Sequence, residues 1–378
     1  MPPPSFDFDD LALEQLRARQ SVKWRRYPPD VLPAWVAETD FPLAPSVRRV
    51  LEEAVARDDT GYASSRGLAD AFAAFAAARF DWVIDPDRTL MVADVMSGVA
   101  EVLRALTGQG DRIVVNPPVY QPFFTVVRDL GREVVEAPLS PAFRLDLDAL
   151  EGAFAGGAQV YLLCNPHNPT GTVFTRDELA EVAELATRYD VLVISDEVHA
   201  PMTLPGATHT PYLTVADEGL ALVSASKAWN LAGLKCALIV AASEESADEL
   251  GRVPGHVSYH AGHFGVLSAI AAFSDDGAWL DAFVAHLDVQ RDRLTKLLAA
   301  ELPAVRFAPP QAGYLAWLDC RELGLGDDPS AVFLERGRVA LSPGPSFGIE
   351  GNGFARLNFA TSGALLTEAV RRMARSLP

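Results

Sequence analysis

Short apolar segments alternate with longer amphipathic segments along most of the chain. Continuous apolar segments between helical ones are typical of parallel strands that are covered on both faces. A helix is expected to open at Thr175, because Thr175 and Glu178 have the spacing of a capping box. The pattern therefore predicts an α/β fold with a mostly parallel seven-stranded sheet between helices. The predicted strands lie at residues 90–96, 112–116, 132–139, 158–164, 191–195, 220–224 and 236–242.

The pattern changes after Asp276, where a long amphipathic segment precedes several strand-like segments and a final helix from Ser362. This order predicts a second, smaller α+β layer, and we expect the N-terminal segment to pack with it. At 378 residues the chain suits one large domain with a smaller one. The predicted divisions are an arm at 1–45, a large domain at 46–280 and a small domain at 281–378.

Composition narrows the class of partner. The formal charge of −18 argues against binding to nucleic acid or to an anionic membrane surface. No signal segment opens the chain, and no apolar run is long enough to span a bilayer. The three cysteines are far apart and odd in number, which predicts reduced thiols in the cytoplasm and disfavours a disulfide framework or a zinc site.

The most informative candidate for chemistry is Lys227, which directly follows the apolar segment 220–224. A lysine whose pKa is lowered can form a Schiff base with an aldehyde. The neighbouring Ser224, Ser226 and Lys235 suit a phosphate group. An aldehyde and a phosphate on one small molecule indicate pyridoxal 5′-phosphate (PLP). Lys227 alone favours an ordinary surface lysine at a strand end, so the hypothesis depends on further partners.

Two polar residues at strand ends supply such partners. Asp196 ends an apolar segment, where an ionised carboxylate needs a cation, and a protonated pyridine nitrogen is one. Asn168 lies between prolines in CNPHNPT and suits hydrogen bonding to the 3′-oxygen of PLP. The alternatives are a metal site at Asp196 and His199, which lacks further well-spaced ligands, and an ordinary turn at Asn168.

Three further segments fit the same ligand. Gly98 opens a predicted helix, whose N–H groups at Val99 and Ala100 would point at an anion. Tyr120 follows a predicted strand and can stack on a planar ring. Tyr62 lies in a loop rich in glycine and serine, from which its phenol could reach a phosphate. Alone, a glycine at a helix start usually indicates only a turn, and a packed surface tyrosine is an equal alternative at Tyr120.

Arg356 lies inside a strand-like segment, where a guanidinium requires an anion; a substrate carboxylate and a structural salt bridge both satisfy it. The segment 344–348, GPSFG, matches the nucleophile elbow of hydrolases. That motif needs a helix directly after it, and the following IEGNG cannot form a stable one. We therefore reject Ser346 as a nucleophile and interpret the segment as a rigid loop that positions Arg356.

Together these motifs resemble the fold-type I PLP enzymes of aminotransferase class I/II, over nearly the whole chain. Lys235 and His199 differ from the best-known aminotransferases and look like the MalY/PatB group of cystathionine β-lyases, or C–S lyases. LPAWVAETDF (32–41) and SKAWNLAGLK (226–235) also match that group. The chain departs from it at AETDF, where ADMDF is more usual, and at Pro201.

The resemblance implies a role for each residue. Lys227 would form the Schiff base and act as the base, Asp196 would pair with the pyridine nitrogen, and Arg356 would hold the substrate carboxylate. Tyr62 would reach the site from the neighbouring subunit of a homodimer and contribute to catalysis. The resemblance further implies that Asn168, Tyr120 and His199 lie beside the cofactor, with Asn168, Tyr120 and Trp35 also at the substrate, and that the phosphate is held by Gly98, Val99, Ala100, Ser224, Ser226 and Lys235.

The implied reaction is β-elimination from a sulfur amino acid such as cystathionine, which gives pyruvate, ammonia and a thiol. An aminotransferase using the same cofactor contacts is the alternative. A DNA-binding regulator is disfavoured, because such regulators carry an N-terminal winged helix, whereas only about 45 residues precede the large domain here and that segment is acidic overall.

Overall fold

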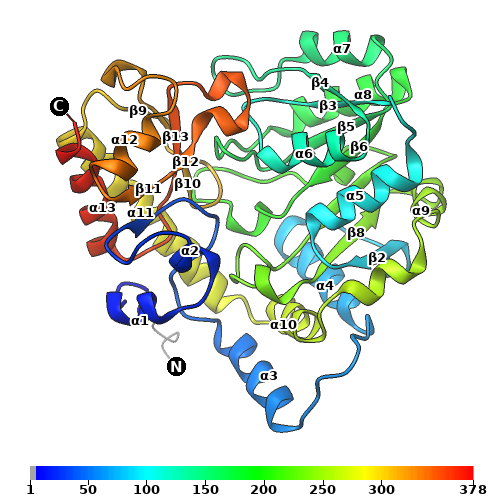
Figure 1. Cartoon of the computed structure of the whole chain (residues 1–378). Helices are drawn as coiled ribbons and strands as arrows, with labels where there is room; N and C mark the ends of the chain where they lie inside the picture. The colour runs from blue at the N-terminus through cyan, green and yellow to red at the C-terminus, as the bar shows by residue number, and fades with distance from the viewer. Residues whose placement is uncertain (1–5, 378) are drawn as a thin grey trace.

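The structure is a computed structural model, and it describes residues 6–377. A seven-stranded sheet forms its centre, in the order β2-β8-β7-β6-β5-β3-β4 (Figure 1). All neighbours pair in parallel except those of β8, which runs antiparallel to β2 and β7. The predicted mostly parallel sheet is confirmed. Its strands are β2 (Thr89–Val92), β3 (Arg112–Val115), β4 (Glu133–Glu136), β5 (Val160–Cys164), β6 (Leu192–Asp196), β7 (Leu220–Val223) and β8 (Ala237–Ala241).

Helices cover both faces of this sheet, and alternate residues of a strand therefore pack in two separate apolar cores. Ile113 and Val115 of β3 belong to one apolar cluster, whereas Val114 between them belongs to another. The first cluster includes residues of α5 and α6, and the second includes residues of α7 and α8. The helices around the sheet are α3 (Pro45–Ala56), α4 (Leu68–Phe80), α5 (Val95–Leu106), α6 (Gln121–Asp129), α7 (Leu147–Ala155), α8 (Arg176–Tyr189), α9 (Glu244–Leu250) and α10 (His263–Phe273).

Helix α8 begins as the sequence predicts. Its N-cap is Thr175, whose hydroxyl accepts from the Glu178 N–H, while the Glu178 carboxylate accepts from the Thr175 N–H. The capping box is therefore confirmed.

The C-terminal part forms a second layer around a four-stranded antiparallel sheet, ordered β12-β13-β10-β9. The N-terminal segment joins this layer, because Leu32 and Pro33 pair in parallel with Val339 and Ala340 (Figure 1). The divisions at 45 and 280 stay a prediction, and residues 1–5 of the predicted arm lie outside the described residues. The elements here are α1 (Leu13–Ala18), α2 (Val22–Arg25), β1 (Leu32–Pro33), α11 (Ala278–Glu301), β9 (Arg306–Phe307), β10 (Leu315–Asp319), α12 (Pro329–Glu335), β11 (Val339–Ala340), β12 (Ser342–Pro343), β13 (Phe354–Asn358) and α13 (Gly363–Arg375).

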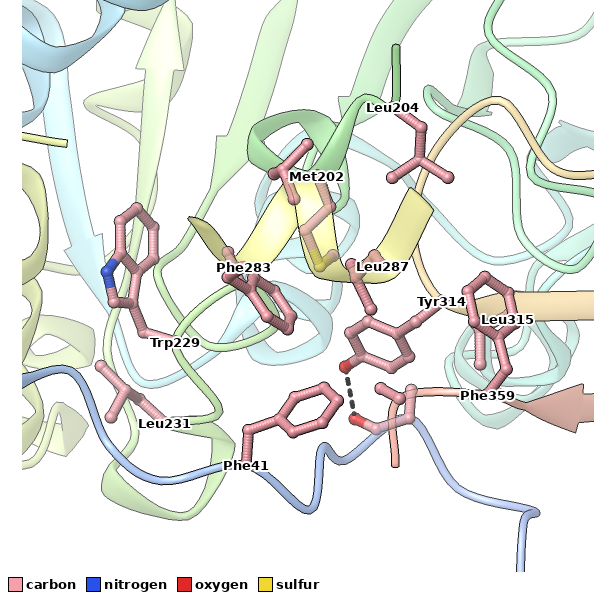
Figure 2. Close-up of a cluster of buried hydrophobic side chains, with 14 of the residues drawn as sticks. Phe41, Met202, Leu204, Trp229, Leu231, Phe283, Leu287, Tyr314, Leu315 and Phe359 are labelled. Carbon is pink, nitrogen blue, oxygen red and sulfur yellow. Dashed lines mark hydrogen bonds between the residues drawn. The ribbon is translucent and has the colours of Figure 1, made fainter. Parts of the chain in front are cut away.

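A buried ion pair fixes the N-terminal segment where the two layers meet. Lys23 Nζ lies 2.9 Å from Asp40 Oδ1, and both side chains are almost fully buried. Asn358 Nδ2 of β13 donates to the Val36 carbonyl at 2.7 Å. Figure 2 shows the apolar cluster at this junction, in which the Tyr314 hydroxyl donates to the Ala37 carbonyl at 3.1 Å. These contacts hold the backbone of residues 36–40 against the C-terminal layer.

Among residues 6–377, no helix combines the length and apolar character that a bilayer crossing requires. Cys164, Cys236 and Cys320 are all buried and free.

Candidate active site

A cavity of about 330 Å³ lies at the carboxyl ends of β6 and β7, where the N-terminal segment and β13 meet the large sheet. Ligands bind at this edge of open α/β sheets. A larger hollow of about 620 Å³ lies elsewhere, beside Phe174 and Thr210, and has none of the predicted residues in its lining. The smaller cavity brings together eight of them: Tyr120, Asn168, Asp196, His199, Ser226, Lys227, Lys235 and Arg356.

Lys227 points into the cavity from the turn after β7. Burial, reinforced by the Arg356 guanidinium, lowers the pKa of its ammonium group, and Asp196 opposes this effect. Its Nζ donates to the Ala37 carbonyl at 3.4 Å. A lysine with a lowered pKa has a larger fraction of neutral amine, the form that attacks an aldehyde or removes a proton. Its place in the cavity lining disfavours the alternative of an ordinary surface lysine.

Asp196 is the last residue of β6 and is only 4% exposed. Burial raises the pKa of its carboxyl group to about 6, although the Val198 N–H donates to it at 3.1 Å and Lys227 favours its charged form. A cation placed beside this carboxylate would offset the cost of burial. Among residues 6–377, no group of three or more His, Cys, Asp or Glu side chains could hold a metal ion.

Arg356 is buried on β13, and burial lowers its pKa to about 10. It donates to Asn168 Oδ1 at 3.0 Å, to the Trp35 carbonyl at 2.9 Å and to Ser342 Oγ at 3.0 Å. Within the described residues, no carboxylate pairs with it and its Nε has no partner. A buried cation that lacks an anion is suited to an anionic ligand, which favours a substrate carboxylate over a structural salt bridge.

The loop 344–348 supports this guanidinium, as expected. Phe347 lies below it, with the Arg356 Cζ 4.9 Å from the ring centroid. The Ser346 hydroxyl donates to the Pro343 carbonyl at 2.7 Å, and the residue is half-buried. The loop forms a short 3₁₀ helix, Gly344–Phe347, instead of a strand-turn-helix elbow.

Asn168 and Tyr120 line the same cavity. Since Asn168 Oδ1 accepts from Arg356, its amide nitrogen is the atom that is left to donate to a ligand. Tyr120 caps α6, and burial raises its pKa to about 12, so it keeps its proton. His199 is buried, and burial lowers its pKa to about 3, with Lys227 and Arg356 adding to the effect. Its imidazole is therefore neutral at physiological pH.

One expectation is wrong at the start of α5. The helix opens at Val95 with Asp94 as its N-cap, not near Val99, so Val99 and Ala100 lie inside the helix and their N–H groups are not free. The Gly98 N–H donates to the Asp94 carbonyl at 2.9 Å. Gly98 instead allows close packing, because an added Cβ would lie 2.7 Å from Leu222 Cδ2.

Val95 and Met96 therefore lie at the opening of the helix, where Gly98, Val99 and Ala100 were expected. They occupy the first two helical positions, whose N–H groups have no acceptor within the helix, and they line the cavity. The sequence carried a signal for this start, because Asp94 is a preferred N-cap residue directly before an apolar helical segment.

Of the two candidate serines, Ser226 lines the cavity and Ser224 lies behind it. The Ser224 hydroxyl donates to the Cys236 carbonyl at 2.7 Å and accepts from the Ser226 N–H at 3.0 Å. Ser224 thus shapes the turn that precedes Lys227. Lys235 also lines the cavity and forms an ion pair with Asp94, at 2.7 Å.

Trp35 is absent from the cavity lining, so its contact with the substrate stays a prediction. Its indole packs against Tyr27 and donates to the Lys23 carbonyl at 3.4 Å, while its own carbonyl accepts from Arg356. Val36 and Ala37 are the cavity-lining residues of this segment, and the sequence analysis missed both. Tyr62 is 90% exposed and lies outside the cavity of its own chain.

Comparison with known proteins identifies the family. The model of aminotransferase class I and II matches residues 36–373. The chain belongs to this family. A Mycobacterium tuberculosis protein named "Putative cystathionine beta-lyase" is 49% identical, over 98% of each chain. Cystathionine beta-lyase PatB of Bacillus subtilis is 32% identical, over 96% of this chain and 98% of its own.

Solved structures agree with this assignment. A crystal structure described as a "putative plp-dependent beta-cystathionase" from Corynebacterium diphtheriae is 36% identical, has a TM-score of 0.94 and covers 99% of each chain. The fold is that of fold-type I enzymes, and the resemblance to the PatB group is confirmed.

Aminotransferases of class I and II depend on PLP, and the cavity has the groups that PLP requires. A lysine with a lowered pKa suits the aldehyde, and a buried carboxyl group suits the pyridine nitrogen. The opening of α5 and Lys235 suit the phosphate. The volume is within the usual range for a small-molecule site.

Proposed function

We propose that the chain is a PLP-dependent carbon–sulfur lyase that catalyses β-elimination from a sulfur amino acid of the cystathionine type. The observation that carries this proposal is the single cavity shared by Lys227, Asp196 and Arg356. Together these supply an amine, an acid for the ring nitrogen and a cation for a substrate carboxylate. Relatives from 32% to 49% identical that bear the cystathionine beta-lyase name support the choice of reaction.

In this proposal Lys227 and Asp196 hold the two ends of the PLP ring, and Asn168 and Tyr120 contact the ring between them. Val95, Met96, Ser226 and Lys235 surround the phosphate, with Ser224 behind them. When bound, PLP supplies an electron-withdrawing ring that stabilises negative charge at the substrate Cα.

The substrate is oriented by Arg356, whose Nε–H has no protein partner and can donate to the α-carboxylate. Asn168 and the Trp35 carbonyl fix the guanidinium in place. A fixed carboxylate directs the Cα–H bond towards Lys227, and this alignment removes the entropic cost of finding a reactive geometry.

Lys227 then moves the proton. Its neutral amine takes the Cα proton, the electron pair forms the Cα–Cβ double bond, and the Cβ–S bond breaks. The Lys227 ammonium returns the proton to the departing thiolate. The released 2-aminopropenoate reacts with water to give pyruvate and ammonia, so atoms and charge balance.

Cystathionine should give pyruvate and homocysteine over many turnovers when the PLP-loaded protein is supplied with no keto acid. An aminotransferase would stop after one amino group per active site, because it needs a keto acid to accept that group. The measurement is pyruvate and free thiol against time, with and without added 2-oxoglutarate. Product formation that depends on 2-oxoglutarate, with no thiol released, would overturn the lyase proposal in favour of transamination.

We propose that the protein acts as a cytoplasmic homodimer. The free, buried cysteines are consistent with a reducing compartment. Tyr62 is exposed on its own chain and available to a neighbouring subunit, where it would complete the phosphate site and assist catalysis. Sedimentation of the active protein should give a mass of twice 40.7 kDa. An active particle of 40.7 kDa would contradict this proposal.

A further inference from the structure

Asp94 has two simultaneous roles at the edge of the cavity. Its Oδ1 accepts from the Ser97 N–H at 2.8 Å and caps α5. Its Oδ2 accepts from Lys235 Nζ at 2.7 Å. The pair joins residues 141 positions apart in the sequence and lies at the place where the proposed phosphate donors meet.

A carboxylate at this position is unfavourable for a phosphate. Lys235 is the cation of the proposed phosphate site, and in this structure it is already paired with an anion. A PLP phosphate that reaches Lys235 and the N–H groups of Val95 and Met96 would lie beside the Asp94 carboxylate. The two like charges repel each other, and the phosphate must share or replace the existing ion pair.

We propose that Asp94 is an internal competitor for the cofactor phosphate: its ion pair with Lys235 lowers the affinity for PLP. This inference rests on the proposed function, because it assigns Lys235 and the opening of α5 to the phosphate. Its consequence is a cofactor that exchanges more readily than it would if the N-cap residue were uncharged.

The substitution Asp94→Asn isolates the charge. Asparagine is as good an N-cap as aspartate, so its Oδ1 can still accept from the Ser97 N–H. The fold of α5 is therefore retained, while one negative charge beside the phosphate is lost. Asp94→Ser keeps a capping hydroxyl with no charge and serves as a second variant if Asp94→Asn folds poorly.

The experiment is a titration of cofactor-free protein with PLP, followed by the absorbance of the lysine-bound cofactor. Asp94→Asn should lower the apparent Kd for PLP about tenfold at low ionic strength. The difference should shrink as salt is added, because salt screens charges at a partly exposed site. An equal or weaker affinity in both Asp94 variants would overturn the proposal, since it would mean that Asp94 mainly orients Lys235.

Two controls test whether the effect is specific to the Asp94 position and whether it depends on the phosphate. Asp146→Asn removes the same charge from an equivalent N-cap, where Asp146 Oδ1 accepts from the Ala149 N–H at 3.0 Å on α7, and it should leave PLP affinity unchanged. Pyridoxal lacks the phosphate, so its affinity should be the same in wild type and Asp94→Asn. Equal gains for pyridoxal and PLP would overturn the role of the phosphate. Absence of any lysine-bound absorbance in the wild type would instead refute the proposed function.

Discussion

Replacing Lys227 by alanine should abolish the absorbance of the lysine-bound cofactor and reduce the rate of pyruvate formation by about 10⁴-fold. The residue is proposed to attack the PLP aldehyde, to take the Cα proton and to return it to sulfur. Its lowered pKa suits all three tasks, because each begins from or regenerates the neutral amine. The measurements are an absorbance spectrum and kcat for cystathionine, each on protein whose PLP content is known.

The matched control for this loss is Lys296→Ala. Lys296 is exposed on α11, away from the cavity, and its removal should leave spectrum and rate unchanged. Thermal unfolding of Lys227→Ala and of wild type shows whether activity is lost with the amine or because the variant does not fold. An external primary amine should restore part of the rate in a folded variant. Retained turnover without any added amine would contradict the assignment of Lys227.

The second large effect is expected at Arg356. Arg356→Lys keeps the positive charge but loses the planar set of N–H donors, so kcat/KM for cystathionine should fall about 100-fold. Most of the loss should lie in KM, because the guanidinium is proposed to bind the carboxylate before and during the reaction. Steady-state kinetics over a range of cystathionine concentrations measures the two constants separately.

A substrate analogue without a carboxylate distinguishes a substrate-binding role of Arg356 from a structural role. An S-substituted cysteamine has the amine and the thioether but no carboxylate, so wild type and Arg356→Lys should both react with it slowly and at similar rates. A variant that loses as much activity with the analogue as with cystathionine would show that Arg356 acts on the fold of the site. Arg338→Lys, at an exposed ion pair with Asp30, provides the control for an arginine outside the cavity.

Asp196 is the proposed partner of the pyridine nitrogen of PLP. Asp196 is buried, and burial raises the pKa of its carboxyl group to about 6, which disfavours the charged form. A protonated ring nitrogen would favour the carboxylate form. Arg356 is likewise buried, and it is a cation that lacks a carboxylate partner among the described residues. An anionic ligand would favour its charged form.

Much of the fold could be predicted from local patterns. The order of strands and helices follows from apolar segments, and the Thr175 capping box fixed a helix start to the residue. The start of α5 was misplaced because Gly98 was interpreted as a turn, whereas it lies where helix and sheet pack closely. A glycine required for packing and a glycine required for a turn look the same in one sequence.

The sequence by itself determined which residues stand at the strand ends, and therefore the Lys227, Asp196 and Asn168 positions, because parallel strands bring their carboxyl ends to one edge. Only the tertiary structure decided how distant residues meet there. Arg356 contacts Asn168 across 188 positions, Trp35 contributes a carbonyl in place of its ring, and Asp94 pairs with Lys235. Such contacts depend on the packing of whole layers, which no local pattern encodes. Lys227 is identifiable from its neighbours in the sequence. The charged groups that shift its pKa, Arg356 and Asp196, are distant in the sequence and close only in the folded structure.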